Sequence, residues 1–160
     1  MNITINIESN DIKKDVYRHL SIIGKRMKTK DGSSMFSSTT LSSAEDGEFD
    51  QHLSDSVARI AAEFSEFITS FSIGSSVDIS ISKERWSESM SAAFVRSVMS
   101  ALVACVTYEI ISVYAPDYAK KFADDTNASI QDLKRHFYTN RLPDIGVDTV
   151  KSCTGTVALD

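Results

Sequence analysis

The chain has 160 residues, a formal net charge of −5 and two cysteines, and its length suits one domain with its own core. The negative charge argues against a general nucleic-acid binder, because affinity for phosphates comes from an excess of Lys and Arg. Cys105 lies in an apolar stretch and Cys153 in a polar one, so we expect no disulfide framework and a reducing compartment. Residues 1–11 lack the basic and apolar regions of a signal peptide.

Two short segments, residues 1–7 and 77–81, alternate apolar and polar side chains as half-buried strands do. Their apolar positions are Ile3, Ile5, Ile7, Val77, Ile79 and Ile81. Because a single short strand needs a partner, we predict that these two pair with each other.

A first helix is predicted from a cap at Ser9 or Asn10 to about residue 29. Its apolar stripe consists of Ile12, Val16, Leu20, Ile23 and Met27.

Residues 29–43 are rich in Ser, Thr and Gly, which predicts a long loop. The apolar anchors of this loop are Met35, Phe36 and Leu41. Loops of this length are often functional or become ordered only when a partner binds.

A second helix is predicted from the capping-box pattern of Ser42 and Glu45 to about residue 71, with Gly74 ending it. Apolar residues recur every three or four positions along it, at Phe49, Leu53, Val57, Ile60, Phe64, Phe67, Ile68 and Phe71.

A third helix is predicted in residues 82–114, and past Arg96 it is apolar over most of its circumference. That pattern is typical of a helix that is buried on all sides or lies in a membrane. Arg96 and Glu109 bracket its purest part, which is shorter than the roughly 18–20 apolar residues of a membrane span. We therefore predict that it is the central helix of a soluble bundle, with the other helices packed around it.

A last helix is predicted to start at Pro116 and to end near Pro143. Its expected buried face consists of Tyr118, Phe122, Ile130, Leu133 and Phe137. The fold class is therefore mainly α: a four-helix bundle domain in residues 1–143, with two or three short strands, followed by an extended tail in residues 144–160. We predict that this tail adds a strand to an edge of residues 3–7 or 77–81, in the same chain or in the next subunit.

Each of the three histidines follows an acidic residue by four positions, in the pairs Asp15–His19, Glu48–His52 and Asp132–His136. A metal site of the di-iron kind needs Glu-x-x-His on two helices and further inward carboxylates, and the spacing here differs. We interpret the three pairs as helix-surface pairs and expect no metal or organic cofactor.

Three residues of the central helix are candidates for a catalytic or ligand-binding site. The apolar surroundings of Cys105 favour an inert core thiol. Glu109 is either a tuned acid or the partner of a Lys or Arg on a neighbouring helix. Trp86 either stacks on a ligand or closes one end of the core. No nucleophile elbow or Gly-rich phosphate loop is present, so we predict that the protein is not an enzyme.

Charge is segmented along the chain, with a basic first helix that includes Lys25, Arg26 and Lys28 and an acidic start to the second helix. Charge runs of this kind are usually solvated faces. The alternative is head-to-tail association of subunits, which closes into a ring when the rotation permits.

The layout resembles that of small head–tail connector (adaptor) proteins of tailed bacteriophages. The resemblance rests on the first helix, DIKKDVYRHLSIIGKRM, on the central apolar helix, and on the close of the last helix, ASIQDLKRHFYTNRLP. It implies a homo-oligomeric ring in the virion neck, commonly twelve-fold and assembled in the host cytoplasm. Such a ring lies beneath the portal protein and docks the next neck or tail protein. DNA passes through its channel without sequence-specific binding, and no membrane is involved.

The resemblance also implies that loops and a C-terminal arm make contacts between proteins. The candidate interaction residues are Lys25, Arg26, Lys28, Met35, Phe36, Leu41, Val150, Val157 and Leu159. The alternative hypotheses are a small helical-bundle enzyme, or a ligand-binding or regulatory module of a bacterium.

Overall fold

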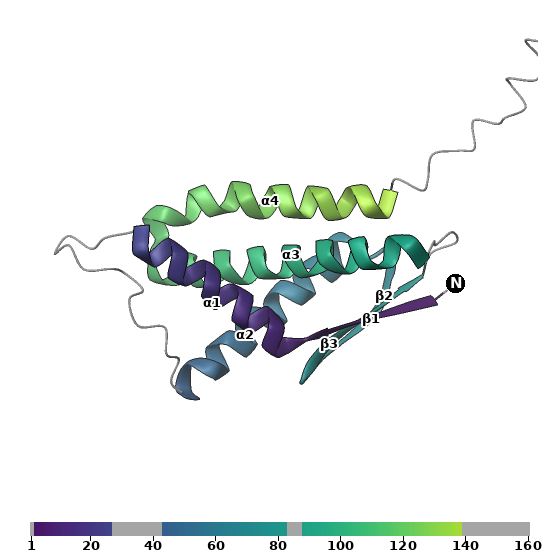
Figure 1. The fold of residues 1–160 in the computed structure, drawn as a ribbon, viewed down its shortest axis with the longest axis horizontal. Coiled ribbons are helices and arrows are strands. Elements are labelled where there is room, and N and C mark those ends of the chain that lie inside the picture. The colour runs from purple at the N-terminus through teal and green to yellow at the C-terminus, as the bar shows by residue number, and fades with distance from the viewer. Residues whose placement is uncertain (1, 27–42, 83–87, 139–160) are drawn as a thin grey trace, which may run out of the picture.

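The computed structural model describes residues 2–26, 43–82 and 88–138 of the chain. Within them the chain forms four helices and one small three-stranded sheet (Figure 1), which confirms the mainly helical fold class. The elements in order are β1 (Asn2–Glu8), α1 (Ser9–Arg26), α2 (Ser43–Glu63), β2 (Ile68–Ile73), β3 (Ser76–Ser82), α3 (Glu88–Tyr114) and α4 (Pro116–Tyr138).

The sheet has the order β1-β3-β2, and both strand pairs are antiparallel. Ile5 lies opposite Ile79, so the predicted pairing of the two alternating segments is confirmed. The prediction that residues 77–81 offer an edge to the tail is wrong, because β3 is the central strand and both of its sides are already hydrogen-bonded.

The predicted extension of the second helix to residue 71 is also wrong. The helix ends at Glu63, and Phe67 N donates to Phe64 O at 2.9 Å in the turn that follows. The chain then enters β2 and returns through Gly74 and Ser75 into β3, so Gly74 lies in a hairpin turn. The residues of β2 are mostly β-branched, aromatic or serine, a composition that favours a strand once a partner strand is available.

The alternation of apolar and polar side chains along β3 gives the sheet one buried face and one polar face. Val77, Ile79 and Ile81 are buried, whereas the opposite face is polar. On that face Asn6 Nδ2 donates to Asp78 Oδ1 at 2.6 Å, and Ser72 Oγ donates to Asp78 Oδ2 at 3.2 Å. One carboxylate therefore links all three strands in a single row.

α3 contacts each of the other three helices. α4 runs beside it after the turn at Ala115, while α1 and α2 cross it at an angle (Figure 1). α3 begins at Glu88. Ser82, the predicted first residue of this helix, is instead the last residue of β3. Trp86 lies outside the described residues. Burial on all sides holds only for the middle of α3, because Val113 near its end is 62% exposed.

By length and composition, residues Ser91–Tyr114 of α3 could cross a membrane, and their most apolar 18-residue window has a mean hydropathy of 1.6. The part bracketed by Arg96 and Glu109 is shorter than a span, so a window of span length includes charged residues. Half of that window is buried inside the structure, and the packing of α3 against three helices is a sufficient reason for its apolar composition.

The predicted core is confirmed for the stripes of α1 and α2, in which Ile12, Val16, Leu53 and Ile60 are at most 2% exposed. Phe64, Phe67, Phe94, Leu102, Val106 and Leu133 are also buried and belong to the same core cluster. The expected face of α4 needs one correction. Tyr118 is 42% exposed, and the small side chains of Ala119 and Thr126 are buried in the interface with α3.

Candidate functional site

Most of the predicted interaction residues lie outside the described part of the chain. Lys28, Met35, Phe36 and Leu41 fall in residues 27–42, and Val150, Val157 and Leu159 in residues 139–160. Lys25 and Arg26 belong to the last turn of α1, where only the backbone is described.

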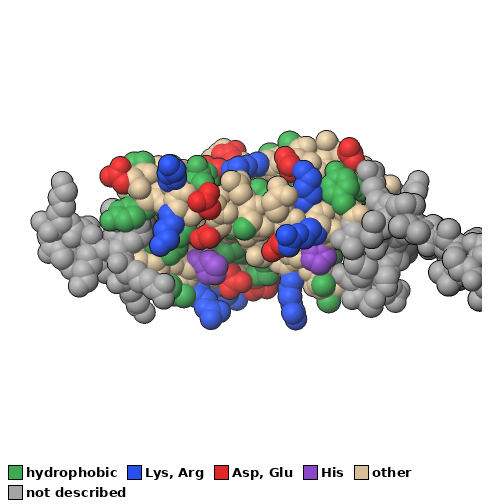
Figure 2. Space-filling model, turned by 90° about the horizontal axis from the view of Figure 1, so that it is seen from above, with side chains coloured by type: hydrophobic (Ala, Val, Ile, Leu, Met, Phe, Trp, Pro, Cys, Tyr) green, Lys and Arg blue, Asp and Glu red, His purple; other side chains and the backbone are tan. Residues whose placement is uncertain are grey.

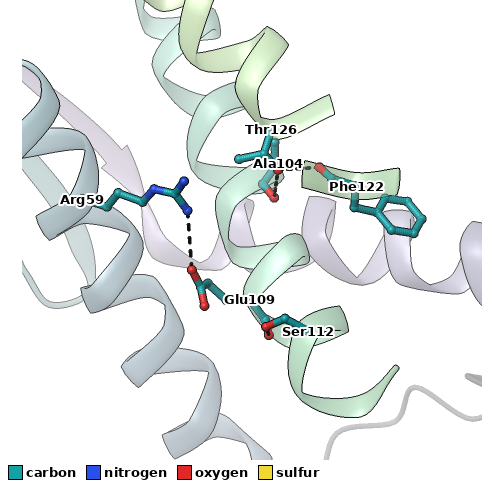
Figure 3. Close-up of polar contacts among 6 residues, drawn as sticks. All are labelled: Arg59, Ala104, Glu109, Ser112, Phe122 and Thr126. Carbon is teal, nitrogen blue, oxygen red and sulfur yellow. Dashed lines mark hydrogen bonds and ion pairs between the residues drawn. The ribbon is translucent and has the colours of Figure 1, made fainter. Parts of the chain in front are cut away.

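The two candidate residues on α3 have structural roles. Cys105 is fully buried, and this burial raises the pKa of its thiol from 9.0 to about 11, so the thiol stays protonated at neutral pH. Glu109 Oε1 lies 3.7 Å from Arg59 Nη1 of α2 (Figure 3), which confirms an ion pair with a neighbouring helix. The side chains are 33% and 47% exposed, so the pair stabilises the fold by at most about 1 kcal/mol.

The acid–histidine pairs do not assemble into a metal site. Asp132 pairs with Arg135 at 3.0 Å, and Glu48 accepts a hydrogen bond from Tyr114 Oη at 2.6 Å. Among the residues placed by the structure, no three His, Cys, Asp or Glu side chains come together as a metal centre requires.

A cavity of about 610 Å³ lies along α3 between α1 and α4, and we call it the α1–α4 groove. Met99, Val103 and Ala104 of α3 line it, with Ile22 of α1 and Phe122 of α4 on the two sides. The space exists because α1 diverges from α4 along α3 (Figure 1) and because α3 presents small side chains there. The groove is mainly apolar and open to solvent, and its volume falls within the range of roughly 300–1,000 Å³ found for ligand pockets.

Four ionisable side chains also line the groove. Asp15 and His19 come from α1, Arg96 from α3 and Asp125 from α4. Within the part of the chain that the structure describes, neither aspartate nor Arg96 takes part in an ion pair. The charges of these three side chains are therefore available to a bound group.

Two threonines on the groove differ in their hydrogen bonds. Thr126 Oγ1 of α4 lies within hydrogen-bonding distance of two backbone carbonyls, Phe122 O at 2.9 Å and Ala104 O at 3.2 Å (Figure 3). The hydrogen bond to Ala104 O joins α4 to α3. Thr107 is 4% exposed, and its Oγ1 has no hydrogen-bond partner among the described residues. A buried hydroxyl without a partner costs about 1–3 kcal/mol. The oxygen of Thr107 exposes less than 1 Å² of surface, so a group bound in the groove does not reach it.

The groove continues at the Arg96 end into a smaller polar pocket of about 220 Å³. Arg96 and the hydroxyls of Ser97, Ser100 and Ser129 line this pocket together with Asp132, which Arg135 already holds. Among the described residues, this end of the groove therefore presents one unpaired arginine, three neutral hydroxyl groups and one carboxylate that is already paired with Arg135.

A second surface feature lies where α3 turns into α4. Val113, Tyr114 and Tyr118 are 62%, 54% and 42% exposed, and we call these three residues the apolar turn. Large hydrophobic side chains exposed together mark a contact surface more often than scattered ones do.

On the face that includes α4, acidic and basic side chains are interspersed and hydrophobic surface lies between them (Figure 2). This face has no broad field of one sign, which disfavours it as a surface for DNA phosphates.

No protein-family model, curated protein or solved structure matches the chain. The functional argument therefore rests on the residues themselves.

The groove was not predicted from the sequence. Its lining residues come from three helices separated by as many as 114 positions, and no local motif connects Asp15 with Ser129. The available signal was the group of small residues on α3, Ser100, Ala104 and Thr107, within an otherwise bulky apolar helix.

Proposed function

We propose that this protein is a structural subunit of the neck of a tailed-bacteriophage virion. In this proposal it is an adaptor and not an enzyme. It associates as a homo-oligomeric ring beneath the portal protein and docks the next neck or tail protein around the DNA channel. The pattern-level resemblance supports this function, and it rests on the basic first helix, the central apolar helix and the close of the last helix.

The observation that carries the proposal is the apolar turn. Tyr114 Oη is held by Glu48, but the apolar surface that Val113, Tyr114 and Tyr118 leave exposed stays in contact with water in an isolated chain. That surface contributes no hydrophobic free energy to folding. Burial of the same side chains against a neighbouring protein recovers the hydrophobic free energy that folding alone leaves unused.

In the proposed assembly, α3 is the central helix of the subunit and the extended C-terminal segment, residues 144–160, contributes to contacts between proteins. The candidate residues Val150, Val157 and Leu159 would act there, with Met35, Phe36 and Leu41 in the 29–43 loop. The apolar turn would supply a contact from the folded domain itself.

Electron microscopy of the purified full chain tests the proposal, with closed rings as the expected particles. The double variant Val113→Ser, Tyr118→Ser should weaken association at least tenfold, because two exposed apolar side chains leave the contact. Phe71→Ser on β2 is the matched control, since Phe71 is 44% exposed at the sheet edge. Dispersed single subunits at all concentrations, or equal effects of the two changes, would contradict the proposal.

A ligand-binding or regulatory module is the second candidate, and the α1–α4 groove is the observation that favours it. A module of this kind would remain a single subunit while binding its ligand, so the same images distinguish it from the adaptor.

A further inference from the structure

The α1–α4 groove has the dimensions of a helix-binding site. It follows α3 from Arg96 to Thr107, which corresponds to about 16 Å at the rise of 1.5 Å per helical residue. About three turns of a partner helix have the same length. The groove is an open trough, whereas a site for a small molecule encloses most of its ligand.

We propose that the α1–α4 groove is a docking site for a basic amphipathic helix of a partner protein. The apolar side chains of that helix pack on Met99 and Val103, and its Lys or Arg side chains reach Asp15 and Asp125 on the opposite walls. This inference goes beyond the proposed ring and does not require it, because a single subunit contains the whole groove.

Among the described residues, the groove is lined by two unpaired aspartates and one unpaired arginine, so its net charge is negative and favours a basic partner. Asp15 and Asp125 stand on different helices at the two sides of the groove, and neither has an ion pair within the described residues. A Lys or Arg side chain suits the space between them, since its apolar stem lies on hydrophobic surface while its charged head stays near the rim. An acidic partner helix would place carboxylates beside two unpaired aspartates.

The Arg96 end of the groove determines the direction of the bound helix. Arg96 and the three serine hydroxyls there suit the unsatisfied carbonyls and negative dipole of a helix C-terminus. The helix therefore lies with its C-terminus at Arg96 and its N-terminus toward Thr107.

Fluorescence anisotropy tests the site with a labelled 14-residue peptide of Leu and Lys in a helical amphipathic pattern. The full-length protein should bind this peptide, and a Leu/Glu peptide of the same pattern should bind at least tenfold more weakly. A peptide with the same Leu and Lys content in strict alternation should also bind weakly, because its apolar residues do not share one helical face.

Two double variants locate the binding. Asp15→Asn with Asp125→Asn should raise the dissociation constant at least tenfold. Asp50→Asn with Asp124→Asn removes the same charge from exposed positions that do not line the groove, and should change the constant less than twofold. Circular dichroism checks that both double variants keep the fold.

Two outcomes would overturn the docking site: equal losses in the two double variants, or equal affinity for the Leu/Glu peptide. Either would show attraction by the overall negative charge, or a hydrophobic contact elsewhere. Because the assay works on single subunits, failure of peptide binding leaves the ring proposal intact, and absence of rings leaves the docking site intact.

Discussion

Replacement of Phe137 by Ala tests the packing that holds α4 to the rest of the domain. Phe137 is 1% exposed in the last turns of α4 and contacts three other aromatic rings. Its ring stacks on Phe64 with centroids 4.6 Å apart and on Phe67 at 4.8 Å, and it meets Phe94 of α3 edge-on at 4.9 Å. One side chain thus joins α4 to α3 and to the turn between α2 and β2.

The expected loss follows from these contacts. A buried Phe→Ala change costs about 3–5 kcal/mol, because transfer free energy is lost and a cavity remains. Each aromatic pair adds about 0.5–1.5 kcal/mol beyond its buried area, so three pairs place this site at the upper end of that range. A domain of this size has a total stability of about 5–15 kcal/mol, so the variant should be close to unfolding.

Urea titration followed by far-ultraviolet circular dichroism measures the change in the free energy of unfolding. Tyr118→Ala on the same helix is the matched control, since the ring of Tyr118 is 42% exposed, and it should cost less than about 1 kcal/mol. A loss for Phe137→Ala no larger than that for Tyr118→Ala would refute the arrangement of α4 on α3.

Three further predictions concern a thiol, a hydroxyl and the tail. Burial raises the pKa of Cys105 from 9.0 to about 11, so the unfolded chain loses its proton first as pH rises. The free energy of unfolding should then fall by about 2 kcal/mol between pH 9 and 11, and in a Cys153→Ser background Cys105→Ala should lack this component. Thr126→Val removes the hydroxyl that joins α4 to the Ala104 carbonyl, and it should lower the free energy of unfolding in the urea titration by about 1 kcal/mol. An unchanged free energy of unfolding would mean that this hydrogen bond does not stabilise the fold. Deletion of residues 150–160 should leave the helical circular dichroism and melting temperature nearly unchanged but abolish ring formation, and unfolding of the deletion variant would show that the tail packs on its own domain.

The sequence was sufficient to predict the elements whose signals are local. Alternation located β1 and β3, and because only two such segments were recognised, their pairing followed. Pro116 set the start of α4, since a proline suits the first position of a helix. Helical spacing also identified the buried residues of α1 and the larger members of the core.

β2 was missed because its residues satisfy two patterns. Phe64, Phe67, Ile68 and Phe71 keep helical spacing, yet Phe71 is 44% exposed in a strand that pairs with β3. The decisive signal was the hairpin turn at Gly74 and Ser75, which places two β-rich segments next to each other. Hydrogen bonding to β3 therefore outweighs the helical pattern of this segment.

The candidate site could not be predicted for a different reason. The groove depends on the angle at which α1 diverges from α4, and that angle follows from the packing of whole helices. Tyr118 illustrates the same point: the periodicity of α4 assigned it to the core, while close packing of Ala119 and Thr126 against α3 rotates it to the surface.

Native mass spectrometry of the purified full chain tests the central proposal most directly. A twelve-fold ring of 17.6 kDa chains has a mass of about 211 kDa, and the proposal predicts one closed species near that mass. A single species at 17.6 kDa across the concentration range would contradict the adaptor function, whatever the groove binds.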